Sequence, residues 1–270
     1  MQDFFSESLS SQNIESEKIE FNIQYKELLE KNGFNSLTDF IFAPRENSYR
    51  DVPGRITVGI DLKCENGTQR AYLKRHWTLS ASKSTGPHKE ALAEWNNIKN
   101  LTQQGISVPD AMAVGHGYIN GHSVGFIIMK EVPGKPADDF IKEDLNPLDK
   151  IQFIKTLAEF SAEFHNMGYN HRDFYLCHIF VNCPGEKFEL NLIDLQRVQK
   201  RQLFRRRWIV KDLAQMAYSS LNFTSRTDRL RFYLKYAGIE SLSAADKKII
   251  EAVNNKVSKM VKREKEGKVR

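Results

Sequence analysis

Two aspartates that flank short strand-like runs carry the clearest chemical signal in this chain. Asp173 lies in the polar loop His171-Arg172-Asp173, and Asp194 follows the apolar run that ends at Ile193. In phosphoryl transfer, one such carboxylate accepts the proton of the attacking hydroxyl and another holds Mg²⁺ on the nucleotide phosphates. The order loop, strand, turn, strand, Asp is therefore typical of a phosphotransferase, provided that phosphate-binding residues lie upstream.

Lys74 and Glu94 are the upstream candidates. The signal Asn66-Gly67 predicts a hairpin turn, and Lys74 lies on the strand expected to return from it. The 3, 4, 3 spacing of Ala91, Glu94, Ile98 and Leu101 predicts a helix with Glu94 on its apolar face. A buried carboxylate needs a partner, and Lys74 is the natural one. Glu90, one helical turn before Glu94, is the competing partner for Lys74. The alternative interpretation of Lys74 is an exposed strand lysine without a role in phosphate binding.

The remaining pattern predicts the elements that must position these residues. Strand-like runs at 108–117 and 123–132 meet at the turn Asn120-Gly121, and the break at 130–134 reads as a connector. Asn146 and Pro147 can begin a long helix that Gly168 ends. Further helices are expected at 208–220, 228–237 and 243–265. The chain is therefore predicted to be α+β, with a small β-rich part containing one main helix and a larger, mostly helical part.

Composition excludes several classes of protein. The chain has 270 residues, 40% hydrophobic and 27% charged, enough for one large domain or two small lobes. No apolar run is as long as a membrane span, and the acidic N-terminus lacks a secretion signal. The chain has only three cysteines, Cys64, Cys177 and Cys183, and such a small, odd number is typical of reduced thiols. Cys177 and Cys183 also lack the spacing of zinc ligands. These features indicate a cytoplasmic protein without a transmembrane segment.

The charge is concentrated in two basic stretches. Residues 197–211 hold seven basic residues and no acidic one, and residues 246–270 hold nine basic and four acidic residues. Such patches suggest an anionic partner: a phosphorylated glycan, acidic lipid headgroups or nucleic acid. No interleaved aromatic platform or nucleic-acid module is present, so nucleic acid is not expected. A solvated basic face is the alternative, especially for the second stretch.

With Lys74, Glu94, Asp173 and Asp194 in this order, the chain resembles the protein-kinase-like superfamily. It is most similar to the Kdo/WaaP lipopolysaccharide kinase family, bacterial enzymes that phosphorylate heptose or Kdo of the inner core. The resemblance extends over residues 72–220. It is carried by Tyr72-Leu73-Lys74-Arg75-His76, Ala93-Glu94-Trp95-Asn96, residues 170–178 (NHRDFYLCH), Ile193-Asp194-Leu195-Gln196-Arg197, Arg206-Arg207-Trp208 and Lys211-Asp212-Leu213.

The resemblance implies a role for each matched residue. Asp173 would be the catalytic base on a loop braced by Arg172, and Asp212 would bond back to the backbone of that loop. Lys74 would hold the α- and β-phosphates of ATP, with Glu94 holding Lys74. By the resemblance, Asp194 and His178 would also bind the metal. The chain itself suggests adenine binding at the connector (Met129, Glu131), phosphate covering near Gly54, and binding of an anionic acceptor by the basic residues after Asp194 (Arg197, Arg201, Arg205, Arg206, Arg207).

The resemblance also implies a two-lobed, protein-kinase-like fold. A flexible segment at 1–20 would precede a nucleotide-binding N-lobe at 21–132 and a catalytic and acceptor-binding C-lobe at 133–270.

Three departures from the protein-kinase pattern bear on this interpretation. His178 stands where protein kinases have Asn, and imidazole suits softer metals than Mg²⁺, so direct ligation, a water-bridged contact and a structural role all stay open. No G-x-G-x-x-G precedes Lys74, so the phosphate-covering loop is expected within 47–59. Asp212 comes only eighteen positions after Asp194, without A-P-E between them, which argues against a peptide acceptor.

The expected function is ATP- and Mg²⁺-dependent phosphorylation of heptose or Kdo in the lipopolysaccharide inner core. The acceptor would be an anionic glycolipid, and the enzyme would contact the cytoplasmic face of the inner membrane peripherally. Two alternatives belong to other classes. One is a kinase-like phosphotransferase for another small molecule, glycan or protein. The other is a kinase-shaped binding protein without catalysis.

Overall fold

The structure is a computed structural model that describes residues 13–45, 47–143, 145–183, 187–201, 203 and 205–267. The chain divides into two compact units, Met1–Val132 and Pro133–Arg270. No helix in the described ranges has the length and apolar character needed to cross a membrane. The two units are called the N-unit and the C-unit below.

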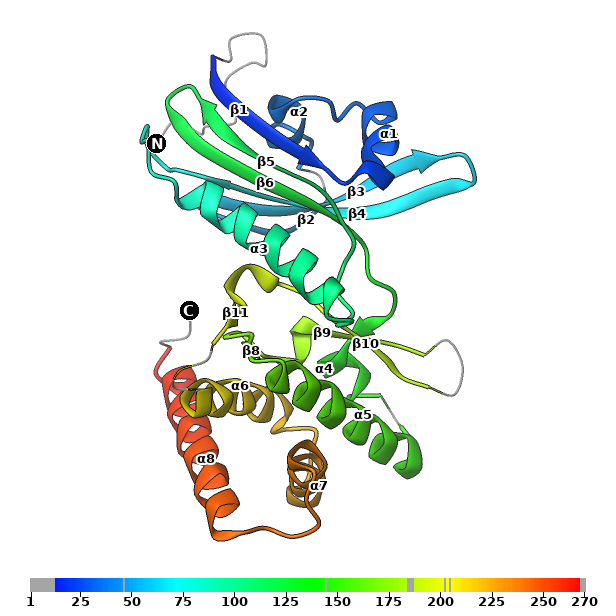
Figure 1. Cartoon of the computed structure of the whole chain (residues 1–270), viewed down its shortest axis with the longest axis vertical. Coiled ribbons are helices and arrows are strands. Elements are labelled where there is room, and N and C mark those ends of the chain that lie inside the picture. Colours follow the sequence, from blue (N-terminus) through cyan, green and yellow to red (C-terminus); the bar gives the residue numbers. More distant parts are fainter. Residues whose placement is uncertain are drawn as a thin grey trace. The chain divides into compact units, whose positions relative to one another are not determined.

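The N-unit is built on an antiparallel sheet of six strands in the order β1-β5-β6-β4-β3-β2. Helices α1 and α2 cover one face, and α3 covers the other (Figure 1). The bounds are β1 Ile14–Phe21, α1 Ile23–Lys31, α2 Leu37–Ile41, β2 Ser48–Val52, β3 Arg55–Cys64, β4 Gly67–Trp77, α3 Gly86–Gln103, β5 Ala111–Ile119 and β6 His122–Lys130.

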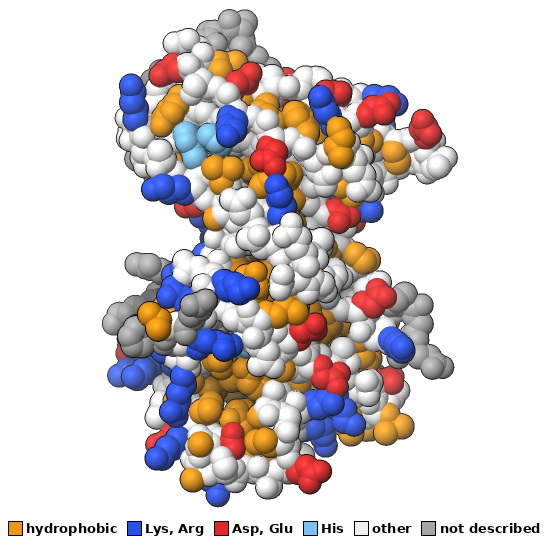
Figure 2. Space-filling model, in the orientation of Figure 1, with side chains coloured by type: hydrophobic (Ala, Val, Ile, Leu, Met, Phe, Trp, Pro, Cys, Tyr) orange, Lys and Arg blue, Asp and Glu red, His pale blue; other side chains and the backbone are white. Residues whose placement is uncertain are grey.

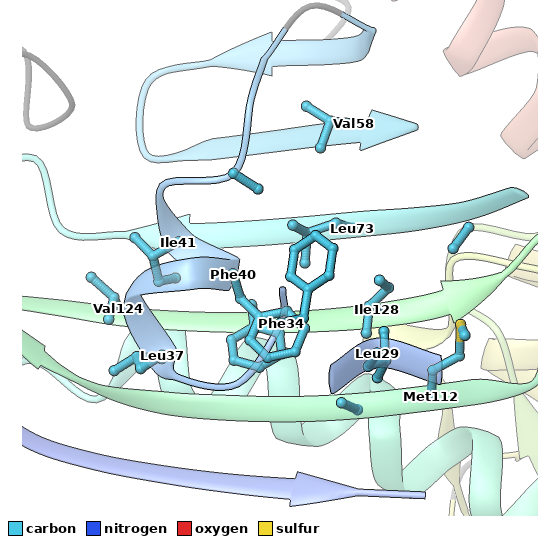
Figure 3. Packing of buried hydrophobic residues seen from close by; sticks show 14 of the residues in the cluster. Leu29, Phe34, Leu37, Phe40, Ile41, Val58, Leu73, Met112, Val124 and Ile128 are labelled. Carbon is cyan, nitrogen blue, oxygen red and sulfur yellow. The ribbon is translucent and has the colours of Figure 1, made fainter. Parts of the chain in front are cut away.

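The apolar run of β6 is explained by this layering. β6 lies between β5 and β4 with helices on both faces, so its residues from Ser123 to Met129 are all buried. Phe40 lies in the core on the α1–α2 side (Figure 3). Its ring stacks on that of Phe126, with the centroids 3.9 Å apart. The expected turn Asn120-Gly121 joins β5 to β6, and both residues have positive φ, as a two-residue hairpin turn requires.

The start of the N-unit differs from the sequence-based expectation. A flexible segment was expected at 1–20. Residues 1–12 of it lie outside the described residues, but from Ile14 the chain forms strand β1, which pairs with β5. Ile19 and Phe21 pack against the core, which explains why this polar stretch is ordered. In addition, Arg75 is fully buried and donates hydrogen bonds of 2.7 Å to the carbonyls of Ile41 and Ala43.

The C-unit is mostly helical, with two small sheets that carry the loops of interest. One sheet consists of three strands in the order β10-β9-β7, and in the other sheet β11 pairs with β8. The bounds are β7 Lys135–Pro136, α4 Ala137–Phe140, α5 Pro147–Asn166, β8 Tyr169–Asn170, η2 Leu176–His178, β9 Ile179–Asn182, β10 Glu189–Leu192, η3 Leu195–Arg197, β11 Gln199–Lys200, α6 Arg205–Ser220, α7 Arg226–Ala237 and α8 Ala244–Lys265.

The long helix α5 begins and ends as its sequence predicts. The Asn146 side chain accepts hydrogen bonds from the N–H groups of Leu148 and Asp149, and Gly168 follows the helix with a φ of +91°. Helix α6 begins earlier than expected, at Arg205 instead of Trp208, so three arginines form its first turn.

Pairing of β9 with β10 brings the two aspartate loops together. Leu192 lies opposite Ile179, so the residues just before β9 and just after β10 are neighbours. The Ile193 N–H donates to the His178 carbonyl at 2.9 Å. The sheet thereby places Asp194 beside His178, whose ring also contacts the carbonyl of Asp173, twenty-one residues before Asp194 in the sequence.

Candidate active site

The N-unit contains the expected ion pair. Lys74 Nζ lies 2.7 Å from Glu94 Oε1, with the Lys74 side chain 17% exposed and the Glu94 side chain 1% exposed. Glu90, the competing partner, pairs instead with Arg55 and with His76 Nδ1 at 3.0 Å. The contacts with His76 and Arg55 lower the pKa of Glu90 to about 2 despite its partial burial. The strand lysine and the helix glutamate are thus fixed together, and their role toward ATP is considered below.

Gly54 lies at the turn between β2 and β3. Its φ is +79°, and a Cβ at this position would lie 3.0 Å from the Trp77 carbonyl oxygen, so glycine is favoured both by conformation and by space. The Gly54 carbonyl accepts a hydrogen bond of 3.0 Å from the Trp77 N–H. The segment expected to cover phosphate is therefore a β-hairpin whose turn is Pro53-Gly54.

Met129 and Glu131 lie at the end of β6, before the C-unit begins. Met129 is paired in the sheet with Tyr72 on one side and Ala111 on the other. The Glu131 N–H donates to the Arg70 carbonyl at 3.0 Å, and its carboxylate accepts from the Tyr72 hydroxyl at 2.9 Å. The Glu131 N–H is already used, so an adenine contact at this residue would need its carbonyl oxygen.

In the C-unit, the buried carboxylate of Asp212 organises the loop that carries Asp173. Its two oxygens accept hydrogen bonds of 2.9 Å from the backbone N–H groups of His171 and Arg172. Asn170 Nδ2 and His165 Nε2 lie 3.3 and 3.4 Å from the same carboxylate. Burial acts to raise the pKa of Asp212, but the His165 contact and these backbone donors hold it below its usual value. These are the contacts expected of a residue that bonds back to the loop.

Arg172 takes a left-handed backbone conformation, with φ at +72°, which is uncommon for a residue with a side chain. Its carbonyl accepts hydrogen bonds from Lys211 and from Gln215 Nε2, the latter at 2.9 Å. Burial lowers the pKa of the Arg172 guanidinium, and the neighbouring Arg197 and Arg201 add to this effect. The bracing therefore comes from backbone contacts around Arg172, which stabilise a strained turn beside Asp173.

Two further loop contacts were missed by the sequence reasoning. Gln215 Oε1 accepts from the Phe174 N–H and Ser219 Oγ accepts from the Leu176 N–H, both at 3.0 Å. With Asp212, they lie at spacings of three and four along α6, which places them on one helical face. The sequence signal that could have revealed these two contacts is the series of polar residues at that spacing in a helix that is otherwise largely buried.

The Asp173 carboxylate is 21% exposed and is contacted by Arg197. Arg197 Nη1 lies 2.8 Å from Oδ2 and 3.0 Å from Oδ1 of Asp173. The Asp173 carbonyl accepts from the Tyr175 N–H at 2.9 Å, so both the backbone and the side chain of this residue are held. Arg197 was predicted to bind the acceptor. In the structure its guanidinium contacts the carboxylate of Asp173, the residue expected to be the catalytic base.

Asp194 and His178 lie side by side. Asp194 is in the left-handed region, with φ 58° and ψ 57°, and its Oδ2 is 3.7 Å from His178 Nε2. The other ring nitrogen of His178 is 2.7 Å from the Asp173 carbonyl oxygen. Burial alone lowers the pKa of His178, but Cys177, Asp194 and the Asp173 carbonyl together raise it to about 9.

The donor set around Asp194 is small. The described residues contain no group of three or more His, Cys, Asp or Glu side chains placed to hold a metal ion. Mg²⁺ is commonly held by one or two carboxylates together with substrate phosphates and water. The Asp194 carboxylate is an oxygen donor of the kind that Mg²⁺ prefers, and one protein carboxylate suits an ion that is held mainly by substrate phosphates and water.

The five predicted acceptor arginines do not form one group. Arg197 contacts Asp173, whereas Arg201 stacks on Trp208 with its guanidinium carbon 4.1 Å from the ring centroid. Arg205 donates to the His165 carbonyl near the end of α5. Arg206 and Arg207 line a groove between α6 and α8, and Arg207 also lies 5.7 Å from the Trp208 ring. Only Arg197 thus directly contacts the Asp173 carboxylate.

Comparison with known proteins agrees with this architecture. A solved structure, WaaP in complex with acyl carrier protein, matches 90% of this chain and 98% of its own, with a TM-score of 0.70 and 24% identity. The chain is 29% identical over 206 residues to the lipopolysaccharide core heptose(I) kinase WaaP of Pseudomonas aeruginosa, covering 70% of this chain and 75% of the relative. It is 30% identical over 183 residues to the Escherichia coli enzyme of the same name, covering 63% and 69%.

The fold is that of the protein-kinase-like phosphotransferases, as predicted. The model of the lipopolysaccharide kinase (Kdo/WaaP) family matches residues 45–236, and the chain belongs to this family. It is accordingly an ATP-dependent phosphotransferase with a sugar hydroxyl as acceptor. The resemblance stated from the sequence motifs is confirmed.

Proposed function

We propose that this enzyme transfers the γ-phosphate of ATP to a heptose of the lipopolysaccharide inner core. The loop that presents Asp173 carries the proposal, because Asp212 fixes its backbone and Arg197 fixes its carboxylate. Heptose is preferred to Kdo because the similar enzymes are named heptose(I) kinases.

Catalysis in this class depends on positioning and on neutralising charge. Lys74, oriented by Glu94, would bind the α- and β-phosphates, and the Pro53-Gly54 turn would cover phosphate. When bound, Mg²⁺ would neutralise charge on the phosphates, and Asp194 would supply its protein oxygen donor. His178, whose pKa is raised to about 9, would stay protonated beside that carboxylate near neutral pH and would not ligate the ion directly. Asp173 would align the sugar hydroxyl and accept its proton.

Arg197 would act at the same carboxylate. An ionised carboxylate offers about four lone-pair sites, so the contacts with Arg197 leave room for the acceptor hydroxyl. The guanidinium would keep the carboxylate oriented and add positive charge where phosphate is transferred. Arg201 would provide charge toward an anionic acceptor, and Arg205 would have a structural role because it caps the α5 carbonyl of His165.

A glycan acceptor is favoured over a peptide by the segment between Asp194 and Asp212. Its seventeen residues contain η3, the two-residue strand β11 and the first turns of α6, which leaves little chain for a peptide platform. The acceptor would be a glycolipid, and the enzyme would meet it at the cytoplasmic face of the inner membrane.

Complementation tests this proposal. The chain would be expressed in bacteria whose own core heptose kinase gene has been deleted. Phosphate on the inner-core heptose, measured by mass spectrometry of purified lipopolysaccharide, is expected to return. Core that stays unphosphorylated while the protein is expressed and folded would contradict the heptose assignment, and phosphate on Kdo instead would replace it.

The C-unit also offers a binding place for a second partner. A partly open pocket of about 660 Å³ is lined by residues of α5, α6, α7 and α8. Figure 2 shows apolar side chains exposed in a hollow at the position of α6 to α8. Its lining is mainly apolar and includes Ile154, Leu157, Leu213, Met216, Leu230 and Val253.

An acyl chain is the chemistry that fits such a pocket, and acyl carrier protein is the partner in the similar solved structure. The proposal therefore includes docking of an acylated carrier protein with its chain in this pocket. Ala217 lines the pocket, and Ala217→Trp would fill part of it. Calorimetry is expected to show roughly tenfold weaker binding of the acylated carrier, since each CH₂ kept out of the pocket loses burial.

Ala245→Trp, on the exposed surface of α8, is the matched control and should bind normally. Equal affinity for acylated and unacylated carrier, or normal binding by Ala217→Trp, would contradict insertion of the chain.

A further inference from the structure

A groove between the first turn of α6 and the middle of α8 is lined by basic side chains. Its volume is about 650 Å³. Arg206 and Arg207 come from α6, and Lys256 and Lys259 come from α8. The other lining residues are Val210, Ala252 and Asn255, so no acidic side chain lies among them. This set of seven is called the basic groove.

The four cations of the basic groove are unpaired within the described residues. None of them makes an ion pair or a hydrogen bond there, and Arg207 alone contacts an aromatic ring, that of Trp208 at 5.7 Å. Other lysines of the C-unit behave differently: Lys142 pairs with Asp139 at 2.8 Å, and Lys150 with Asp228 at 3.4 Å. Like charges gathered without a counter-charge repel one another, so an anion that enters the groove is stabilised.

The helix that supplies two of these cations adds to the effect. The first turns of α5, α7 and α8 each contain an aspartate, as the helix dipole favours, whereas the described first turn of α6 has none. Positive side chains there oppose the dipole. A bound anion would offset both the repulsion between the cations and their unfavourable interaction with the helix dipole.

An exposed apolar side chain lies close in the sequence to two of these charges. Leu203, three residues before Arg206, is 75% exposed. Lys and Arg side chains gather along the side of the C-unit where α8 lies (Figure 2). Cations beside an exposed aliphatic side chain fit a membrane interface, where headgroups meet the charges and the acyl boundary takes the apolar group.

We infer that the basic groove docks the enzyme on an anionic lipid surface through headgroup phosphates. The inference rests on the proposed function in one respect, that the acceptor is carried on a lipid. Charges spread over an open groove suit many headgroups at once. Nucleic acid, which has the same charge, would leave the exposed leucine without a partner.

Vesicle sedimentation tests the inference without any turnover. The full chain is mixed with vesicles of phosphatidylcholine alone or with added phosphatidylglycerol. It is expected to bind only the anionic vesicles, and to be released when NaCl is raised, because salt screens exposed charges. Lys256→Gln/Lys259→Gln is expected to weaken the partition at least roughly tenfold.

Matched variants exclude trivial causes. Lys155→Gln/Lys247→Gln removes the same charge from exposed helical positions outside the groove and should bind within about twofold of the unchanged chain. Arg206→Lys/Arg207→Lys keeps the charge and should also bind. Thermal unfolding reports whether each variant is folded.

The inference is overturned if the unchanged chain ignores anionic vesicles, or if both lysine pairs weaken binding equally. Tighter binding to a single-stranded RNA oligonucleotide than to the vesicles would also overturn it. Because no step requires kinase activity, failure here leaves the proposed reaction intact, and an inactive kinase leaves this test valid.

Discussion

Replacing Asp173 by asparagine is expected to lower kcat by about 10³-fold, within the range that a positioned general base contributes. The amide cannot accept the proton of the sugar hydroxyl, and it loses the charge that Arg197 holds at 2.8 Å. Affinity for ATP is expected to stay within about threefold, since the phosphates are assigned to other residues. Steady-state ADP release and ATP titration calorimetry measure the two quantities.

A matched control for this substitution is present in the N-unit. Asp61 also pairs with an arginine, Arg70, at 2.9 Å, but its side chain is 56% exposed. Asp61→Asn makes the same chemical change in a surface pair, and activity should stay near that of the unchanged enzyme. An Asp173→Asn enzyme with more than about a tenth of normal kcat would refute the role of Asp173.

Replacing Asp212 by alanine is expected to produce the largest loss of stability. It leaves the N–H groups of His171 and Arg172 without the acceptor that each now has at 2.9 Å. Buried donors without acceptors cost about 1–3 kcal/mol each, so the free energy of unfolding should fall by about 2–6 kcal/mol. Urea unfolding measures it, and kinase activity should fall as the Asp173 loop is released.

Asp149→Ala, in the first turn of α5, is the control and should cost no more than about 1 kcal/mol. The Asp212 effect should also depend on pH. Because the folded protein holds the pKa of Asp212 below its usual 3.8, the carboxylate contributes its full stability above that value. The contribution is lost as the pH falls through the lower folded pKa. A difference between Asp212→Ala and the unchanged chain that does not shrink at acid pH would contradict this account.

Local signals made much of the fold predictable. Asn146, Pro147 and Gly168 fix the ends of α5 through contacts within a few residues, and Asn120-Gly121 fixes the β5–β6 turn. The Lys74–Glu94 pair was also predictable, because helical spacing alone placed Glu94 on the buried face.

Contacts that depend on distant segments were not predictable. The burial of Arg75 requires the carbonyls of Ile41 and Ala43, more than thirty residues away. The contact of Arg197 with Asp173 follows from the left-handed backbone of Asp194, which turns the chain into η3. Neither the helix or strand propensities of these residues nor the spacing of apolar residues in the sequence predicts such a turn.

The most direct test of the central claim is phosphate transfer by the purified chain. Dephosphorylated inner-core lipopolysaccharide would be incubated with ATP and Mg²⁺, and the product analysed by mass spectrometry. Our account predicts one phosphate added to heptose by the unchanged chain and none by Asp173→Asn. ATP that binds but is never transferred to this acceptor, with the unchanged chain folded, would contradict the account.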